Sequence, residues 1–457
     1  MKDQVLSRLL HGVKKPKAAV VEPKEEQVVN ERQLTQEKNI KVYKKGETVG
    51  DAPKRIESFS EVALPSEVLE KIRHPEPTPI QKQAIPVMQK GLDAIFVAPT
   101  GSGKTLAYIL GIISSLSTSK SVKKSAKPNK KNNKKSEKKE EKKSGVQALV
   151  VCPTRELGKQ IRDEFLKVTP KDYKVIYLTA QVLQNWAKEP PRKHQPEILI
   201  TTPLRLQKAK KYLNLKELSH LVLDEADRLL DDAFVAQIDE LLGELPVGCQ
   251  KSLFSATIPT NIEHLAKGIF ALGGGEEHYV KVVVGRPNAS VTAITQKLLF
   301  VGQEEGRLMA VRQLLAAGEL KPPTLLFCES IQRAQVLFEE LKRHGLRIGL
   351  IHSQMSEAER FKNVQDFAQG RTWFLICTEL LARGLDLSVM SVVNYDFPAS
   401  TASYIHRIGR TGRAGQRGEA VTLFSLSDTR NLPIVVNVMR ESGCEVPEWM
   451  SQLKKHK

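Results

Sequence analysis

Cysteine, aromatic residues and long apolar runs are all scarce in this chain of 457 residues. No apolar run approaches the roughly 20 residues that cross a bilayer, so we expect no transmembrane segment and no membrane partner. The cysteines stand singly, without the paired spacing of zinc sites or disulfide frameworks, and indicate buried thiols in a reducing compartment such as the cytosol or nucleus. These five cysteines are Cys152, Cys249, Cys328, Cys377 and Cys444.

Acidic residues are also in deficit, because 52 Asp and Glu stand against 70 Lys and Arg and give a formal charge of +18. Half of that excess lies between Ser117 and Ser144, which hold 12 Lys and 3 Glu. A basic balance favours a polyanionic partner, and nucleic acid is the leading one. The same stretch also suits an inert solvated loop or a nuclear import signal, and its composition does not separate the three.

Short apolar runs alternate with helical patterns along most of the chain, and its length exceeds what one core holds. We therefore predict two α/β domains, at 56–272 and 291–434, each with a parallel sheet flanked by helices. A polar disordered extension (1–55), a lysine-rich loop (117–144), a linker (273–290) and a C-terminal extension (435–457) complete the prediction. The expected strands are 94–97, 148–152, 175–178, 198–201, 221–224 and 252–255 in the first domain, and 298–301, 324–328, 348–351, 374–377, 392–395 and 420–424 in the second.

A glycine-rich turn follows the first of these strands and precedes an apolar helix, which is the context that a phosphate-binding loop requires. Gly101 and Gly103 let backbone N–H groups turn toward phosphates, and the helix N-terminus adds partial positive charge. Lys104 can reach the outer phosphates, and Thr105 offers a hydroxyl to magnesium. The loop consists of Ala98, Pro99, Thr100, Gly101, Ser102, Gly103, Lys104 and Thr105.

Two adjacent carboxylates, Asp224 and Glu225, end the apolar strand 221–224. Asp224 is placed to hold magnesium, partly through water, and Glu225 to orient or deprotonate an attacking water. An acidic loop that merely solvates a strand end is the alternative. The phosphate loop upstream makes nucleotide hydrolysis the better interpretation.

A cluster of basic residues lies far downstream, at His406, Arg407, Arg410 and Arg413. Arginines in such a loop can neutralise charge on a transferred phosphoryl group. Because the cluster belongs to the second domain, hydrolysis would then require both domains. A basic turn that binds nucleic acid is the alternative.

In this order the motifs resemble those of the DEAD-box RNA helicases, from Phe59 to Phe424. The resemblance implies two tandem RecA-like domains, ATP with Mg²⁺, and single-stranded RNA bound across both domains. It assigns nucleotide contacts to Phe59, Gln81, residues 98–105 and Asp386, and arginine fingers to Arg410 and Arg413. It assigns coupling to Asp227, Ser255, Thr257, His406 and Arg407. It assigns RNA contacts to Pro153, Thr154, Arg155, Thr202, Pro203 and Thr378.

Four positions depart from the family pattern and put RNA-backbone contacts in doubt more than catalysis. Residues 78–81 resemble the family's Q-motif, which contains Gln81, and His74 stands where the family has an aromatic ahead of it. Leu178–Gln181 lacks the usual glycine pair. Leu204 replaces a glycine, and Glu357 replaces a glutamine.

Segments of the second half, among them 298–302, 379–384 and 443–448, are closest to a nucleolar subfamily of small-subunit ribosome assembly. The resemblance implies a pre-rRNA substrate, ribosome assembly factors as partners, a nuclear and nucleolar location, and a monomeric helicase that separates short duplexes locally. Two alternatives stay open: an ATP-gated RNA clamp with little unwinding, and a DNA helicase.

Overall fold

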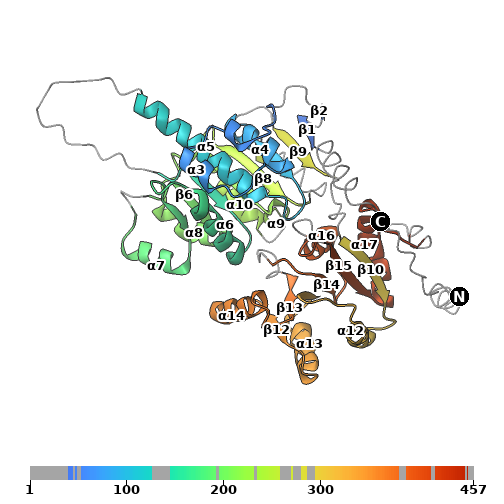
Figure 1. Ribbon diagram of the computed structural model, residues 1–457. Coiled ribbons are helices and arrows are strands. Elements are labelled where there is room, and N and C mark those ends of the chain that lie inside the picture. Colours follow the sequence, from blue (N-terminus) through green and yellow to red (C-terminus); the bar gives the residue numbers. More distant parts are fainter. Residues whose placement is uncertain are drawn as a thin grey trace, which may run out of the picture. The chain divides into compact units, whose positions relative to one another are not determined.

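The computed structural model in Figure 1 contains two α/β domains, each built on one sheet. It describes residues 40–44, 47–48, 53–125, 145–191, 195–230, 234–257, 269–270, 279–285, 294–379, 387–412, 417–447 and 450. The predicted fold class, two tandem parallel-sheet domains of the RecA-like type, is confirmed.

The first sheet has nine strands in the order β2-β1-β9-β3-β8-β7-β4-β6-β5. From β9 to β5 all neighbours are parallel, whereas β1 pairs with β9 and β2 in antiparallel fashion. The strands are β1 (Ile40–Lys44), β2 (Glu47–Thr48), β3 (Ala94–Val97), β4 (Ala148–Val151), β5 (Val175–Tyr177), β6 (Ile198–Thr201), β7 (His220–Asp224), β8 (Gln250–Ser255) and β9 (Val280–Val284).

Successive residues of these strands point to opposite faces, so each face builds its own apolar core. Phe96 packs with α4, α5 and α6 on one face, and its neighbour Ile95 packs with α8, α9 and α10 on the other. The helices of this domain are η1 (Phe59–Glu61), α3 (Ser66–Lys71), α4 (Pro79–Gln89), α5 (Lys104–Ser125), α6 (Arg155–Val168), α7 (Ala180–Lys188), α8 (Pro203–Ala209), η2 (Lys210–Tyr212), α9 (Ala226–Leu229) and α10 (Val235–Leu242).

The second sheet has six parallel strands in the order β10-β15-β14-β11-β13-β12. Leu325 and Leu326 face opposite cores, one shared with α16 and α17 and the other with α12 and α13. The strands are β10 (Ile294–Phe300), β11 (Thr324–Cys328), β12 (Ile348–Ile351), β13 (Phe374–Thr378), β14 (Ser391–Asn394) and β15 (Gly418–Phe424). The helices are α12 (Gly306–Ala316), α13 (Ile331–Arg343), α14 (Glu357–Ala368), α16 (Thr401–Ile408), η3 (Leu426–Arg430) and α17 (Leu432–Glu441).

Two segments predicted to lie outside the domains belong to the first sheet. β9, inside the predicted linker 273–290, lies between β1 and β3 because its valines are buried there. β1, inside the predicted disordered extension, pairs along its whole length with β9, and Ile40 and Val42 pack against the core. The prediction was wrong at both places. The three glycines at 273–275 and the polar composition of 1–55 indicated a linker and a disordered extension, and the strand patterns there are too short to indicate otherwise.

Two further boundaries differ from the prediction. α5 continues to Ser125, so the first residues of the predicted lysine-rich loop are helical, and residues 126–144 lie outside the described part. α17 extends past residue 434, and its Val435 and Val438 are buried in the core of the second domain. An apolar helix face, not a separate extension, therefore closes this domain.

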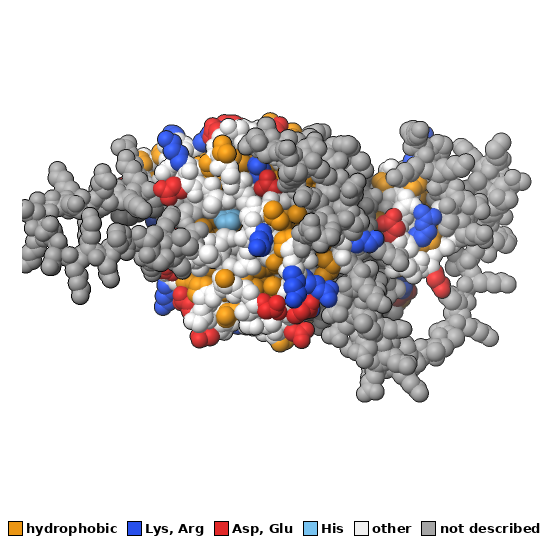
Figure 2. Space-filling model, turned by 90° about the horizontal axis from the view of Figure 1, so that it is seen from above, with side chains coloured by type: hydrophobic (Ala, Val, Ile, Leu, Met, Phe, Trp, Pro, Cys, Tyr) orange, Lys and Arg blue, Asp and Glu red, His pale blue; other side chains and the backbone are white. Residues whose placement is uncertain are grey.

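Four of the five cysteines are buried, as expected of isolated thiols, and Cys444 is half-buried. Within the described residues, no helix is long and apolar enough to cross a membrane. On the face seen in Figure 2, acidic and basic side chains of the described residues lie interspersed among apolar and uncharged ones.

Candidate functional site

The phosphate loop connects β3 to α5 at the carboxyl edge of the first sheet. Gly101 and Gly103 have φ values of 75° and 89°, a left-handed conformation that glycine adopts without strain. A Cβ on Gly103 would lie 2.4 Å from the Gln81 amide nitrogen, so close packing also requires glycine there. The Lys104 ammonium donates to the carbonyls of Ala98 (2.6 Å) and Pro99 (2.9 Å) and thus stays within the loop.

Gln81 ties this loop to the start of α4. Its side-chain carbonyl accepts from the Thr78 N–H (2.9 Å) in a capping box, and its amide donates to the Gly103 carbonyl (3.1 Å). The Thr78 hydroxyl donates to the Ser102 carbonyl (2.7 Å). The predicted nucleotide residue Gln81 is therefore part of the frame of the phosphate loop.

The aromatic predicted to pack on the nucleotide, Phe59, is buried in the core of the first domain. It lies in η1 behind a Ser58 capping box, and Val62 and Ile80 belong to the same cluster. His74, which departs from the family pattern, is exposed.

The acidic pair lies at the end of β7. Asp224 is 4% exposed; one carboxylate oxygen accepts from the Tyr108 hydroxyl (3.0 Å) and the other from the Glu225 N–H (2.9 Å). Burial raises the pKa of Asp224, and the nearby Lys104 ammonium opposes that rise. Glu225 has φ 50° and ψ 51°, the one non-glycine residue with positive φ in the described parts of the chain. Such strain in a residue with a Cβ is typical of functional sites.

Asp227 connects the acidic motif to residues of both domains. Its carboxylate accepts from the Thr257 hydroxyl (2.5 Å) and lies 3.4 Å from the His406 Nε2. Ser255 fixes Thr257, because its hydroxyl donates to the Thr257 carbonyl (2.6 Å) and accepts from the Thr257 N–H (3.2 Å). Four predicted coupling residues thus form one buried chain of contacts.

The fifth coupling residue, Arg407, has a separate set of partners within the second domain. It donates to Glu379 (3.0 Å) and to the Asp396 carbonyl (2.8 Å), and its side chain is 3% exposed. Glu379 also accepts from the Ser403 hydroxyl. Arg407 is therefore a buried cation whose charge is balanced inside its own domain.

Next to Arg407, the Gly409–Arg410 turn approaches the phosphate loop. The Thr100 hydroxyl donates to the Gly409 carbonyl (3.2 Å), and a Cβ on Gly409 would lie 2.2 Å from that hydroxyl. Arg410 follows directly and is 5% exposed. Arg413 and Asp386 lie outside the described residues, so their predicted roles are not tested.

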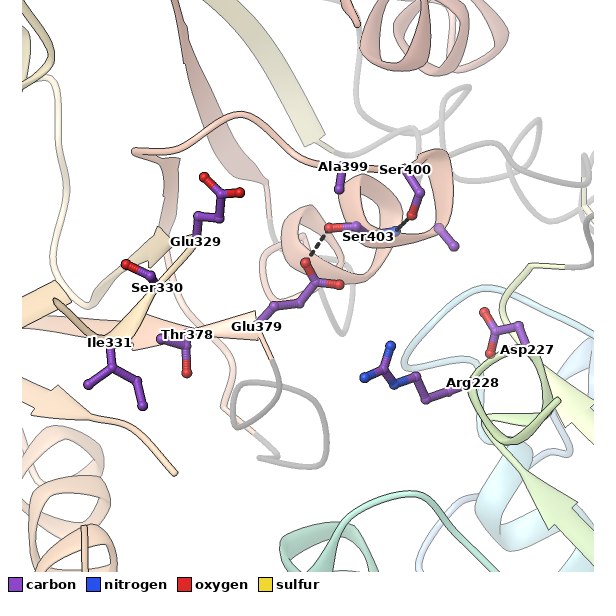
Figure 3. A pocket seen from close by; sticks show the side chains of 11 residues that line it. Asp227, Arg228, Glu329, Ser330, Ile331, Thr378, Glu379, Ala399, Ser400 and Ser403 are labelled. Carbon is purple, nitrogen blue, oxygen red and sulfur yellow. Dashed lines mark hydrogen bonds between the residues drawn. The ribbon is translucent and has the colours of Figure 1, made fainter. Parts of the chain in front are cut away.

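A pocket of about 560 Å³ lies beside these contacts and is drawn in Figure 3. Its lining combines the predicted coupling residue Asp227 with the predicted RNA residue Thr378. Arg228 lines it from α9, and the Glu379 carboxylate turns toward Ser403. Charges of both signs and several hydroxyls therefore face this space.

A larger pocket of about 830 Å³ is lined by α6, the start of α7 and residues of β12 and α14. Arg155 is the predicted RNA residue that lines it and is exposed. The sequence prediction missed the other basic groups of this lining, which come from α6, α8 and α14. These are Lys159, Arg162, Lys167, Arg205 and Arg360.

The other predicted RNA residues of the first domain are buried and lie at the N-terminal ends of α6 and α8. The Thr154 hydroxyl accepts from the Leu157 N–H (3.3 Å) as the N-cap of α6, and Thr202 and Pro203 begin α8. Tyr177 joins the two motifs, since its hydroxyl donates to the Arg155 carbonyl (2.9 Å) and accepts from Arg205 (2.8 Å). The two motifs are thus adjacent, and Arg155 carries their exposed charge.

Two family models match this chain: DEAD/DEAH box helicase at residues 78–265 and Helicase conserved C-terminal domain at residues 306–415. The ATP-dependent RNA helicase ROK1 of Yarrowia lipolytica is 40% identical over 397 residues, which are 84% of this chain and 68% of that protein. ROK1 of Eremothecium gossypii is 38% identical over 432 residues, 90% of this chain and 71% of that protein.

Among solved structures, Saccharomyces cerevisiae Dbp5 bound to RNA and ADP BeF3 superimposes with a TM-score of 0.70 at 26% identity. The match covers 86% of this chain and 95% of Dbp5. Fold, motif geometry and relatives agree, and the chain belongs to the DEAD-box family of ATP-dependent RNA helicases.

Proposed function

We propose that this protein hydrolyses ATP on its first domain and uses the second domain to make hydrolysis depend on bound RNA. The observation that carries the proposal is the pair of contacts made by Asp227, which bonds Thr257 of the first domain and lies beside His406 of the second. It joins the acidic motif to α16, the helix that carries Arg407 and is followed by Arg410. A movement of either domain would therefore shift Asp227 and, with it, the neighbouring carboxylates Asp224 and Glu225.

On the first domain, the backbone of the phosphate loop has the conformation that binding of nucleotide phosphates requires. Two left-handed glycines turn N–H groups inward at the start of α5, and Lys104 is already held within the loop. We assign the outer phosphates to Lys104 and the attacking water to Glu225. Arg410 stabilises charge on the transferred phosphoryl group, and Arg413 is proposed to assist it.

Thr105 and Asp224 suit magnesium, because hydroxyl and carboxylate oxygens are the hard ligands that this ion prefers. When bound, the ion neutralises phosphate charge. Asp224 has both oxygens oriented by hydrogen bonds, so the carboxylate is set before any ligand arrives. The chain thus supplies a prearranged ligand at little entropic cost.

For RNA, we assign the surface lined by Arg155, Lys159, Arg205 and Arg360, together with the segments that hold Thr154, Thr202 and Thr378. Its guanidinium and ammonium groups suit phosphates, so binding depends weakly on sequence. The α7 N-terminus, where the family has a glycine pair, lines the same pocket through Ala180 and Gln181. We propose that this edge replaces the glycine contacts to the backbone of the RNA.

We further propose that the RNA is pre-rRNA of the small ribosomal subunit, that assembly factors are the partners, and that the protein acts in the nucleolus as a monomer. The support is the likeness to the ROK1 helicases along with the segment resemblances of the second domain. Crosslinking of the protein to RNA in cells, followed by sequencing, tests this assignment. Reads concentrated in the small-subunit precursor support it, and reads spread over messenger RNA contradict it.

Local strand separation and ATP-gated clamping differ in one measurement. A short RNA duplex with a single-stranded tail is incubated with the protein and ATP, and both released strand and retained protein are followed. Release in proportion to ATP turnover supports a helicase. Retention on RNA without release identifies a clamp instead.

A further inference from the structure

Tyr108 lies beneath the magnesium ligands proposed above, although no motif includes it. It stands on α5, three residues after Thr105 and therefore on the same face of the helix. Its hydroxyl donates to Asp224 Oδ2 at 3.0 Å. This hydrogen bond therefore connects α5, the helix that carries Thr105, to Asp224 at the end of β7.

The position of this hydroxyl is fixed by aromatic packing. The ring of Tyr108 is 0% exposed and meets Phe254 edge-on at 5.2 Å and Phe165 at 6.4 Å between centroids. Phe254 is in turn stacked on Phe96 at 4.4 Å. Rings at such distances pack through their faces and edges alone, so a phenylalanine would satisfy the core.

The hydroxyl is therefore unnecessary for packing and has to be explained by its polar contacts. A buried phenol needs a partner, and a buried carboxylate needs donors. Burial, followed by the charge of Asp224, raises the pKa of Tyr108 well above its ordinary value of 10.0, so the phenol stays a donor. Its hydrogen bond also favours the ionised form of Asp224, against the effect of burial.

We propose that Tyr108 is a positioning residue that holds the Asp224 carboxylate in the orientation that binds Mg²⁺ with nucleotide. The inference rests on the proposed ATPase function. Tyr108 does not touch the reacting atoms and acts through Asp224. Partners of this kind orient metal ligands, and removing one typically lowers metal affinity by about 10- to 100-fold.

The test is equilibrium binding of a fluorescent ADP analogue to the full chain, titrated with Mg²⁺ and repeated in EDTA. Tyr108→Phe is expected to raise the half-saturating Mg²⁺ concentration by about 10-fold. Binding in EDTA is expected to stay within about two-fold of wild type, since the phosphate loop is intact. An unchanged Mg²⁺ requirement overturns the proposal.

Tyr173→Phe is the matched control, because its hydroxyl also bonds a side chain of α5, Ser117 at 3.2 Å, but lies away from Asp224. A double-mutant cycle with Asp224→Asn separates positioning from packing. Tyr108→Phe should have no further effect on the Mg²⁺ requirement once Asp224 is Asn, and additive effects overturn the proposal. If wild type itself binds nucleotide without any response to Mg²⁺, the proposed function fails instead.

Discussion

The carboxyl edges of the two sheets follow the same plan but carry opposite chemistry. In the first domain the edge holds a glycine-rich loop and three carboxylates, Asp224, Glu225 and Asp227. In the second, the corresponding edge leads into α16, whose His406 and Arg407 precede Arg410. In the proposed function, the first edge binds the phosphates and a metal ion, and the second edge stabilises the charge that develops on the transferred phosphoryl group.

The two edges also differ in how they balance buried charge. Asp224 is buried with a phenol and a backbone N–H as its hydrogen-bond donors, and its pKa is raised. Arg407 is equally buried but has a full carboxylate partner in Glu379. The first edge is therefore under electrostatic strain that a ligand cation would relieve, whereas the second is satisfied by its own residues.

Arg410→Ala should lower RNA-stimulated ATP turnover by about 10³-fold or more, which is the usual contribution of an arginine finger. ATP binding should change little, since the nucleotide is held by the first edge. Steady-state ATPase assays and fluorescent ATP titration measure the two effects. Arg417→Ala, an exposed arginine of the same domain, serves as the control. If Arg410→Ala hydrolysed ATP at the wild-type rate, the second edge would have no part in catalysis.

Glu225→Gln should reduce turnover by about 10²- to 10⁴-fold, because the amide cannot accept the proton of the attacking water. The side chain keeps its size, so ATP binding should be retained. The same two assays apply, with the exposed Glu217→Gln as the control. A rate within a few-fold of wild type would remove Glu225 as the catalytic base.

Glu379→Gln should lower the free energy of unfolding by about 1–3 kcal/mol, because Arg407 then lacks its charged partner in a buried site. Urea unfolding of the full chain measures the change. Glu329→Gln, an exposed carboxylate that lines the same pocket, is the control. Equal stability of both variants would contradict the charge balance assigned to the second edge.

Asp224→Asn should have the smallest effect on stability and the opposite sign. Because the pKa of Asp224 is raised in the folded protein, its ionised form destabilises the fold at neutral pH, and the variant should unfold at a higher temperature. The gain should shrink as the pH falls and disappear below the ordinary value of 3.8, where the wild-type carboxylate is protonated in both the folded and the unfolded state. Asp239→Asn is an exposed control. Destabilisation at neutral pH would show that the first edge is not strained.

The core strands of both domains could be predicted because each is a continuous apolar run between turns. β1 could not, since Ile40 and Val42 alternate with polar residues in a polar stretch and are buried only through β9. β9 follows three glycines, which outweighed its valines. Pairing between segments far apart in the sequence leaves no local signal, and these two strands depend on it.

At the site, the phosphate loop and the acidic pair carry their chemistry in consecutive residues and could be located from spacing alone. Tyr108 could not, because a tyrosine in an apolar helix is indistinguishable from an ordinary core residue until its hydroxyl is seen 3.0 Å from Asp224. The arginines that line the 830 Å³ pocket were missed for a similar reason. Arg155, Arg205 and Arg360 come from three separate helices.

The most direct test of whether hydrolysis at the first edge depends on the second is an ATPase assay of the full chain. The protein is titrated with single-stranded RNA and, separately, with single-stranded DNA of the same sequence. We predict that RNA stimulates hydrolysis strongly, that DNA does not, and that Glu225→Gln and Arg410→Ala each abolish the stimulated rate. A rate that does not respond to RNA, or that responds equally to DNA, would contradict the account.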